Sequence, residues 1–185
     1  FHFGVDGISV AMILLTSLVV VAGVLVSWNI EKMTKEFYFL LLLLGLGAYG
    51  FFISLDLFIL FFFLEISVIP KYLLIGIWGS GKKEYSANKL ALMLMGGSAL
   101  ILVGMLGLYF TAGHSVDILA LSKTDIPVNI QNLLFPLLFV GFGVFTALFP
   151  LHTWVPDGPS SAPTAGSMFL AGISVATLLF ADLTN

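Results

Sequence analysis

The stretch FGVFTALFPLHTWVPDGPSSAPTAGSMFLAGISV, residues 142–175, decides the fold of this chain. Its two ends are apolar, and a polar, proline-rich segment joins them. Lipid cannot satisfy the broken backbone between two membrane-length helices, so this segment must be buried in protein or line a wet cavity. We call residues 149–163 the hinge segment and expect a functional site there. Its candidate residues are His152, Trp154, Pro156, Asp157 and Pro163.

The composition of the whole chain is that of an integral membrane protein. Hydrophobic residues make up 59% of the 185 residues and charged residues 9%, whereas about 25% of a soluble domain is charged. Apolar segments recur along the whole chain, which excludes a lone secretory signal. The chain has no cysteine and three scattered histidines. These residues give no zinc, haem or iron–sulfur spacing, and we expect no metal or cofactor on this chain.

We expect an all-α integral membrane protein with one transmembrane domain over residues 1–185. A helix needs about 20 apolar residues to cross the hydrocarbon of a bilayer. Asp56 alone separates the second and third apolar runs, which predicts a tight helical hairpin; the boundary could equally lie near Ser54. The six expected spans are about 8–28, 37–55, 57–78, 90–110, 133–148 and 164–183.

The lysines predict how these spans are oriented. Five of them fall in the first, third and fifth loops, whereas the opposite side holds only Lys123. Lysine-rich loops face the cytoplasm or its equivalent. Both termini would then face the other side, and residues 149–159 would lie on the cytoplasmic side. The five lysines are Lys32, Lys35, Lys82, Lys83 and Lys89.

Glycines punctuate the second and fourth spans, with a Gly96–Gly97 pair in the fourth. Small residues allow two membrane helices to pack closely. The alternative is a helix that is locally unwound at this pair.

Glu65 is the most informative single residue. It lies about nine residues into the third span, a depth of about 13 Å, which is close to the middle of the bilayer. A carboxylate there costs at least about 2.5 kcal/mol, so such residues usually belong to proton relays. The alternative is a protonated Glu65 that hydrogen-bonds a neighbouring helix. Pro70 leaves the carbonyl of Ile66 without its helical donor and predicts a break or kink below the carboxyl group.

Two lysines compete as the partner of Glu65. Lys71 lies about 120° around an ideal helix from Glu65, so it would face the carboxyl group only if a kink rotated it. Otherwise its side chain would extend towards Trp78 and the membrane interface. Lys89 is either an interfacial lysine or a buried one that points at Glu65 from the next helix. We expect Lys89 to be the partner, within about 4 Å or through one water.

His152 has a side chain that can carry a proton at working pH. Asp157 lies nearby in the hinge segment and could orient it. A hydrogen-bonded structural histidine is the alternative. In both cases we expect His152 and Trp154 to be mostly buried in an irregular hinge segment.

Together these residues resemble the antiporter-like subunits of respiratory complex I, above all those of the chain 4, or M, type. The resemblance runs through GVDGISVAMILLTSLV (4–19), FFFLEISVIPKYLLIGIWG (61–79) and FPLHTWVPDGPSSAPTAGS (149–167). It implies proton transfer across the membrane, driven by quinone reduction elsewhere in the complex. Cation/proton antiporters and membrane-bound hydrogenases contain related subunits. A cation/proton antiporter subunit and a transport-inactive scaffold are therefore the alternative functions.

The resemblance also implies roles for particular residues. Glu65 matches the glutamate of the family's Glu–Lys pair, and Lys89 matches a frequent lysine. The two lysines of the family relay would match Phe145 and Ala176, so both are missing here. Pro159 stands where a histidine is common. The implied relay consists of Glu65, Lys89, His152 and Asp157, with Lys71 as an alternative member, and Pro70, Trp154, Pro156 and Pro163 as structural hinge residues.

The family's subunits have more helices, arranged in two inverted halves. The chain corresponds to roughly the first half of such a subunit, either as a fragment or as a natural truncation. The expected partners are the other membrane-arm subunits of a complex I-like assembly and the lipid bilayer, with no nucleic acid. NADH, FMN, iron–sulfur clusters and quinone are expected in partner subunits. The expected location is a bacterial cell inner membrane, with a mitochondrial or plastid membrane as the alternative.

Overall fold

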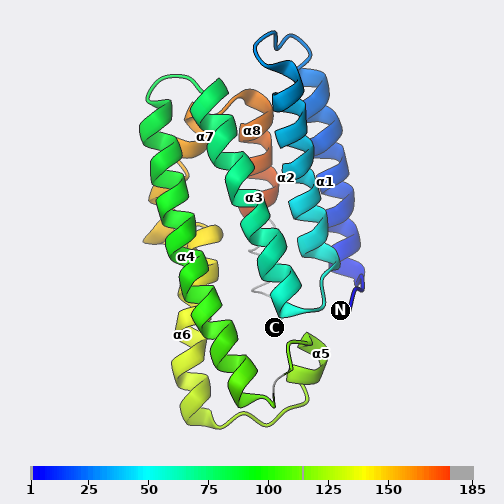
Figure 1. Cartoon of the computed structure of the whole chain (residues 1–185), viewed down its shortest axis with the longest axis vertical. Helices are drawn as coiled ribbons and strands as arrows, with labels where there is room; N and C mark the ends of the chain where they lie inside the picture. Colours follow the sequence, from blue (N-terminus) through cyan, green and yellow to red (C-terminus); the bar gives the residue numbers. More distant parts are fainter. Residues whose placement is uncertain (1, 114, 176–185) are drawn as a thin grey trace.

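The computed structural model describes residues 2–113 and 115–175, and these form a bundle of long helices (Figure 1). Five helices are long and apolar enough to cross a membrane. Within the described residues there is no strand, only two isolated β-bridges. The chain is therefore an all-α integral membrane protein, as expected. The five helices are α1 (Gly7–Val26), α2 (Thr34–Ile53), α3 (Leu57–Trp78), α4 (Lys83–Thr111) and α6 (Val128–Phe145).

The expected sixth span is described only in its first part. α8 (Thr164–Phe169) continues directly into the π-helix η2 (Leu170–Val175). The rest of the span expected over 164–183 lies outside the described residues, so a sixth membrane crossing stays a prediction.

Short elements connect the long helices. α5 (Ile118–Leu121) lies between α4 and α6, and the hinge segment contains the 3₁₀ turn η1 (Leu151–Trp154) and the short helix α7 (Asp157–Ser161). The expectation of an irregular hinge segment is therefore wrong over these two elements.

The connection between α2 and α3 is as tight as expected. Asp56 accepts hydrogen bonds from the backbone N–H groups of Phe58 and Ile59 at 3.0 and 3.3 Å, which caps α3. Asp56 is buried, because two other segments, around residues 2 and 117, form backbone hydrogen bonds with this connection. The Leu55 N–H donates to His2 O at 3.1 Å, and the Leu57 N–H donates to Val116 O at 2.9 Å.

The α1–α2 and α3–α4 connections lie at the same end of the bundle, at the top of Figure 1. They carry Lys32 and Lys82, Lys35 follows in the first turn of α2, and we call this the lysine-rich end. Which side of a membrane this end faces stays a prediction.

Buried side chains form two cores that meet at α3. The first joins α3 to α4, to the end of α6 and to Trp154. The second joins α1 and α2 to α8, with Leu74 as the contribution of α3. α3 is therefore the central helix of the bundle, covered by α2 on one side and α4 on another.

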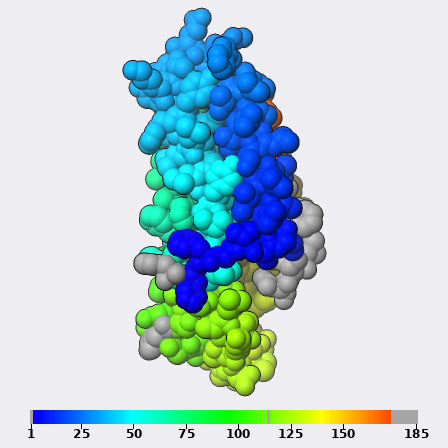
Figure 2. Space-filling model, turned by 90° about the vertical axis from the view of Figure 1, so that its right-hand side faces the viewer, coloured from blue at the N-terminus to red at the C-terminus, as the bar shows by residue number. Residues whose placement is uncertain are grey.

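The outer face of α1 is apolar and exposed. α1 and α2 run along the surface in the view of Figure 2. The exposed side chains on α1 follow one another at helical spacing, opposite the stripe that Met12, Thr16 and Val19 bury. A continuous exposed apolar stripe of this kind is typical of a helix that contacts lipid or another membrane helix. Its members are Val10, Leu14, Leu18, Val21 and Leu25.

Glycines bring α4 and α6 into close contact. A Cβ atom added at Gly97 would lie 2.9 Å from Val144 Cβ, and one added at Gly107 would lie 2.3 Å from Leu134 Cδ2. α4 is continuous through Gly96 and Gly97. The close-packing interpretation is confirmed for Gly97 and Gly107 but not for Gly96, which has nothing within 4 Å of an added Cβ, and the helix is not unwound there.

α3 is also continuous, because its α-helix runs through Pro70 to Trp78. The predicted break at Pro70 is therefore wrong, whereas a kink there stays a prediction. Proline removes one backbone donor, but packing against neighbouring helices can hold such a membrane helix together. Pro70 is buried, and α3 has helices on both sides that provide this support.

The α4–α6 contact predicts opposite effects at two adjacent glycines. In Gly97→Ala the new methyl group would meet Val144 Cβ at 2.9 Å and Gly141 O at 3.0 Å, whereas Gly96 has nothing within 4 Å of an added Cβ. We expect Gly97→Ala to lower the thermal midpoint of the purified membrane assembly. Gly96→Ala should leave it unchanged or raise it, since alanine is better than glycine in a helix by about 1 kcal/mol. Equal midpoints for the two variants would contradict this packing.

Candidate functional site

α6 ends in the interior of the bundle. Its residues Leu134, Leu138 and Val144 pack in antiparallel register against Gly107, Gly104 and Gly97 of α4. This register places Phe145, the last residue of α6, opposite the middle of the 29-residue helix α4. Figure 1 shows the chain leaving α6 at this level and then rising to α7 at the lysine-rich end. The hinge segment therefore begins in the middle of the bundle, not in a loop at its end.

A buried helix end must satisfy the carbonyl groups of its last turn. Ala147 adopts φ 57°, and this left-handed residue turns the chain back on α6. The Leu148 N–H then donates to Gly143 O at 2.9 Å, and the Ala147 N–H donates to Val144 O at 3.3 Å. These two bonds form a Schellman motif, which is common where a helix ends.

Trp154 completes the end of α6. Its indole Nε1–H donates to Val144 O at 2.8 Å, and its side chain is 1% exposed. The expectation that Trp154 is buried is confirmed. This tryptophan joins η1 to the end of α6 by both packing and a hydrogen bond.

The second half of the hinge segment is attached to the start of α4. Lys89 Nζ donates to Asp157 Oδ2 at 2.6 Å. The hydroxyl groups of Ser86 and Ser161 lie 2.8 Å apart, and the Ser80 N–H donates to Ser161 O at 2.9 Å. These contacts hold α7 at the lysine-rich end.

These contacts overturn two of the expected relay contacts. Lys89 pairs with Asp157, not with Glu65, so the expected Glu65–Lys89 pair is wrong. Asp157 does not orient His152. The His152 ring is exposed and stacks on Phe149, with centroids 5.6 Å apart. The expectation that His152 is mostly buried is wrong as well.

The remaining hinge prolines begin short helices. Pro156 precedes α7, and Pro163 precedes α8. A proline immediately before a helix is well suited to this place because its fixed φ favours the entry and it has no N–H to satisfy. Both are consistent with the structural role expected from the sequence.

Glu65 is half-buried, on the face of α3 that also carries the exposed side chains of Phe62 and Ile69. It is eight residues after the start of α3 and thirteen before its end, or about 12 Å and about 20 Å along the axis. Its Oε1 atom is buried and accepts no hydrogen bond. A buried carboxyl oxygen with no partner is rare in folded proteins and calls for an explanation.

Lys71 is the buried cation closest in sequence to Glu65. The residue is 6% exposed, so its side chain does not extend to the interface as one alternative held. Lys71 and Glu65 do not form a direct salt bridge, since within the described chain the only such bridges are His2–Asp117 and Lys89–Asp157.

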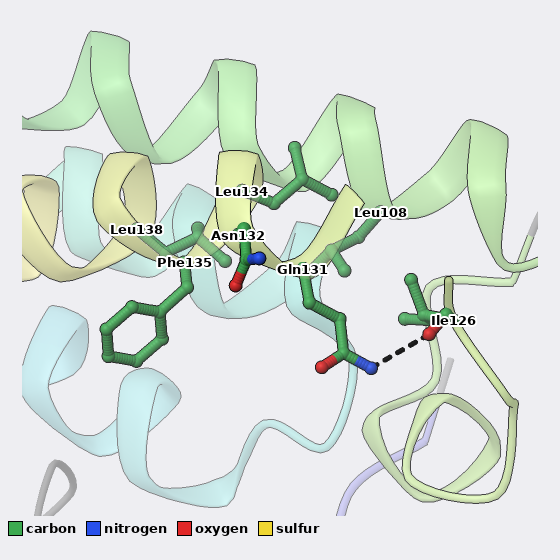
Figure 3. Close-up of a pocket in the computed structure, with 7 residues that line it drawn as sticks. All are labelled: Leu108, Ile126, Gln131, Asn132, Leu134, Phe135 and Leu138. Atoms are coloured by element: carbon green, nitrogen blue, oxygen red, sulfur yellow. Dashed lines mark hydrogen bonds between the residues drawn. The ribbon is translucent and has the colours of Figure 1, made fainter. Parts of the chain in front are cut away.

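A cavity near the other end of the bundle offers no titratable group. It has a volume of about 350 Å³ and lies between the end of α4 and the start of α6 (Figure 3). Three of its seven lining residues are leucine, and two of the others are joined by a hydrogen bond, in which Gln131 Nε2 donates to Ile126 O at 2.8 Å. We therefore place the candidate site at Glu65 and the hinge segment.

The comparisons with known proteins agree with this geometry. The family model described as NADH:quinone oxidoreductase/Mrp antiporter, transmembrane, matches residues 54–184, which include Glu65 and the hinge segment. The chain belongs to this family. The family relationship therefore covers both halves of the candidate site.

Curated relatives are similar over nearly the whole chain. NAD(P)H-quinone oxidoreductase chain 4 1 of Synechococcus sp. is 38% identical over 94% of this chain and 33% of the relative. The chloroplastic chain 4 of Angiopteris evecta is 38% identical over 94% of this chain and 36% of the relative. The chain thus spans about a third of the length of these relatives.

Solved structures show the same helical arrangement. A chain of respiratory complex I from Thermus thermophilus with bound aureothin aligns with a TM-score of 0.84 and 29% identity, over 99% of this chain and 42% of the other. A chain of the membrane-bound sulfane sulfur reductase, an archaeal respiratory membrane complex, aligns with a TM-score of 0.78 and 30% identity, over 92% and 36%.

Sequence reasoning missed two features of the site. The pairing of Ser86 with Ser161 has no signal in the sequence, because serines at an interface resemble serines in a loop. The Lys89–Asp157 pair could have been predicted, because the two residues carry opposite charges and both were expected on the cytoplasmic side of the membrane. It was overlooked because Asp157 was assigned to His152 and Lys89 to Glu65.

Trp154→Phe tests how the end of α6 is held. The variant keeps most of the ring packing but removes the donor to Val144 O. Val144 O would keep only the 3.3 Å bond from the Ala147 N–H, and the loss of one hydrogen bond costs about 0.5–1.5 kcal/mol, so we expect a lower thermal midpoint for the assembly. Trp28→Phe is the matched control, because Trp28 is 74% exposed. If both variants lower the midpoint equally, the Trp154 hydrogen bond does not hold this helix end.

The Lys89–Asp157 contact can be tested by a double-mutant cycle. We expect Lys89→Met and Asp157→Asn each to lower the thermal midpoint, because each leaves one charge without its partner. The double variant should lose less than the sum of the two single losses. Lys82→Met is the control, since Lys82 is exposed at the same end. Strictly additive losses would show that the two side chains are not coupled.

Proposed function

We propose that this chain is part of a proton-translocating, antiporter-like membrane subunit, in which Glu65 binds and releases the transported proton. The observation that carries the proposal is the buried Oε1 of Glu65, which has no hydrogen-bonding partner and lies well inside the membrane-length helix α3. Ionisable groups at this depth serve proton and ion pathways far more often than structure.

The proposal includes the assembly in which the subunit works. The relatives named as NAD(P)H-quinone oxidoreductase chain 4 and the complex I neighbour support membership in the membrane arm of such a complex. Quinone reduction in partner subunits would then drive the proton transfer. NADH, FMN, iron–sulfur clusters and quinone would bind to those partners, and neighbouring membrane-arm subunits would cover part of this bundle.

The geometry supports the following roles for this chain's own residues in proton transfer. Glu65 holds the proton on its carboxyl group at mid-depth. The end of α6 and the hinge segment break the helical backbone on the path between this depth and the lysine-rich end, where Lys89 and Asp157 form a polar contact. Polar, broken backbone inside a membrane bundle is typical of a route for ions or protons.

A transport-inactive scaffold is the second candidate function, and one observation favours it. Phe145, which matches a lysine of the family relay, is 3% exposed and packs into the apolar core. The position of the second missing lysine, Ala176, lies outside the described residues. A cation/proton antiporter subunit remains an alternative assembly for the same fold, since the family includes both kinds of protein.

The proposal predicts the effect of Glu65→Gln in the complete complex. The variant keeps the size of the side chain but cannot take up a proton, so we expect fewer protons translocated per NADH oxidised by the complex in liposomes. Assembly should be unchanged. Glu84→Gln is the matched control, because Glu84 is exposed in the first turn of α4.

The alternatives make different predictions for this experiment. An unchanged ratio of protons to NADH in Glu65→Gln would contradict the proposal and favour a scaffold. Co-purification of the chain without quinone-reducing subunits, together with cation-dependent proton exchange, would instead favour an antiporter.

A further inference from the structure

An apolar groove lies between the start of α2 and the end of α3. It has a volume of about 400 Å³, and its walls include Phe39, Leu73, Ile77 and Trp78. Phe39 is 65% exposed, so the groove opens on the outside of the bundle. Because α2 starts and α3 ends at the lysine-rich end, the groove lies where the bundle would meet a membrane surface.

An exposed stripe on α2 continues the groove towards the middle of the bundle. Phe39, Leu42 and Leu46 are each more than half exposed, and their spacing of three and four residues places them on one face of the helix. Lys35 begins the same face, four residues before Phe39. The helix rises about 16 Å from Lys35 to Leu46, close to the thickness of about 15 Å that one leaflet of hydrocarbon has. The face therefore combines a cation at one end with an apolar path as long as an acyl chain.

Lysines surround the outer end of the groove. Lys35 is one of the residues that line it. Lys83 Nζ donates to Ile77 O at 3.3 Å, so a second ammonium group lies against a residue of the wall. Trp78 Nε1–H donates to Lys32 O at 2.7 Å, which places the backbone of a third lysine beside the wall.

Carboxylates of the described chain do not neutralise these lysines. The two ion pairs found within residues 2–113 and 115–175 are His2–Asp117 and Lys89–Asp157, and neither includes a lysine of the groove. Glu36 is the one carboxylate among the described lining residues. It lies in the first turn of α2, where the helix dipole favours a negative charge. An anionic group from outside the chain would therefore find ammonium groups that lack a carboxylate partner.

We propose that this groove binds an anionic phospholipid, with the phosphate at Lys35 and an acyl chain along Phe39, Leu42 and Leu46. Side chains of a helix point towards its N-terminus, so the ammonium group of Lys35 extends away from the apolar stripe, and Lys83 adds positive charge nearby. Basic pockets between membrane helices on the cytoplasmic side bind the headgroups of anionic lipids, and the lysines predict that this end faces that side. The proposal does not depend on the proposed function.

Photolabelling of the assembled complex in nanodiscs tests the site directly. The probes are a phosphatidylglycerol and a phosphatidylcholine that carry the same photoreactive group on an acyl chain, and mass spectrometry locates the labelled residues. We expect phosphatidylglycerol to label residues 39–46 about fivefold more than phosphatidylcholine, the preference that one lysine gives for an anionic lipid. Equal labelling by the two lipids would overturn the proposal, because the groove would not select the headgroup. Absence of labelling by both would also overturn it, since a partner helix would then cover the groove.

Substitutions of lysine separate the groove from the general charge of this end. Lys35→Gln should lower labelling by phosphatidylglycerol about fivefold, to the level of phosphatidylcholine, whereas Lys35→Arg should retain it. Lys82→Gln is the matched control, because Lys82 is exposed at the same end but does not line the groove. If Lys82→Gln lowers the labelling as much as Lys35→Gln does, the positive charge of the whole end attracts the lipid and the proposal fails.

The apolar part of the site is tested by Phe39→Ala. Removing this exposed ring shortens the wall along which the acyl chain lies, so we expect less labelling of residues 39–46 by phosphatidylglycerol. Phe110→Ala is the matched control, since Phe110 is 66% exposed and lies at the opposite end of the bundle, in the last turn of α4. Unchanged labelling in Phe39→Ala, or an equal loss in Phe110→Ala, would contradict the assigned path of the acyl chain.

Discussion

The fold depends on hydrogen bonds to the backbone carbonyl groups at the end of α6, which lies inside the bundle. A helix that ends between membrane helices exposes carbonyl groups that no lipid can bond. Here the left-handed turn at Ala147 and the indole of Trp154 bond the last carbonyls of α6. Because the chain itself provides these hydrogen bonds, residues 149–163 can run from the middle of the bundle to its lysine-rich end while packed against protein.

The close approach of α4 and α6 follows from the same constraint. Gly97 and Gly141 lie against each other's backbone, so there is no room for lipid beside the broken helix. The first two turns of α4 then bind the far end of the hinge segment through Lys89 and Ser86. One helix thus supports the hinge segment at both ends, which explains why α4 is longer than a membrane crossing requires.

Much of this architecture could be predicted from the sequence, because hydrophobic length and the need to satisfy backbone groups are local properties. The helical class, the tight turn at Asp56 and the burial of Trp154 follow from them. Contacts that depend on register between helices could not be predicted. The fourth span was expected to begin at residue 90, but α4 begins at Lys83. This shift places Lys89 within the helix, beside Asp157, and closer to the lysine-rich end than Glu65 is.

The exposure of His152 and the unbroken course of α3 through Pro70 have the same origin. Both depend on neighbouring elements, since Phe149 offers a ring for His152 to stack on and two helices support α3 around its proline. A sequence shows that a residue is able to break a helix or carry a proton. It does not show whether the surrounding structure allows this.

Two lysines lie at similar distances from the lysine-rich end, but their surroundings differ. Lys71 is seven residues from the end of α3 and Lys89 six from the start of α4, or about 10 Å and about 9 Å. Lys89 is partly exposed and binds an aspartate that is also partly exposed. Such a contact fixes geometry but is screened by its surroundings. Lys71 is 6% exposed on the face of α3 that belongs to the apolar core, so a charge near it would be screened far less. Similar depth therefore does not make the two lysines equivalent, because the surroundings of each side chain decide how strongly its charge acts.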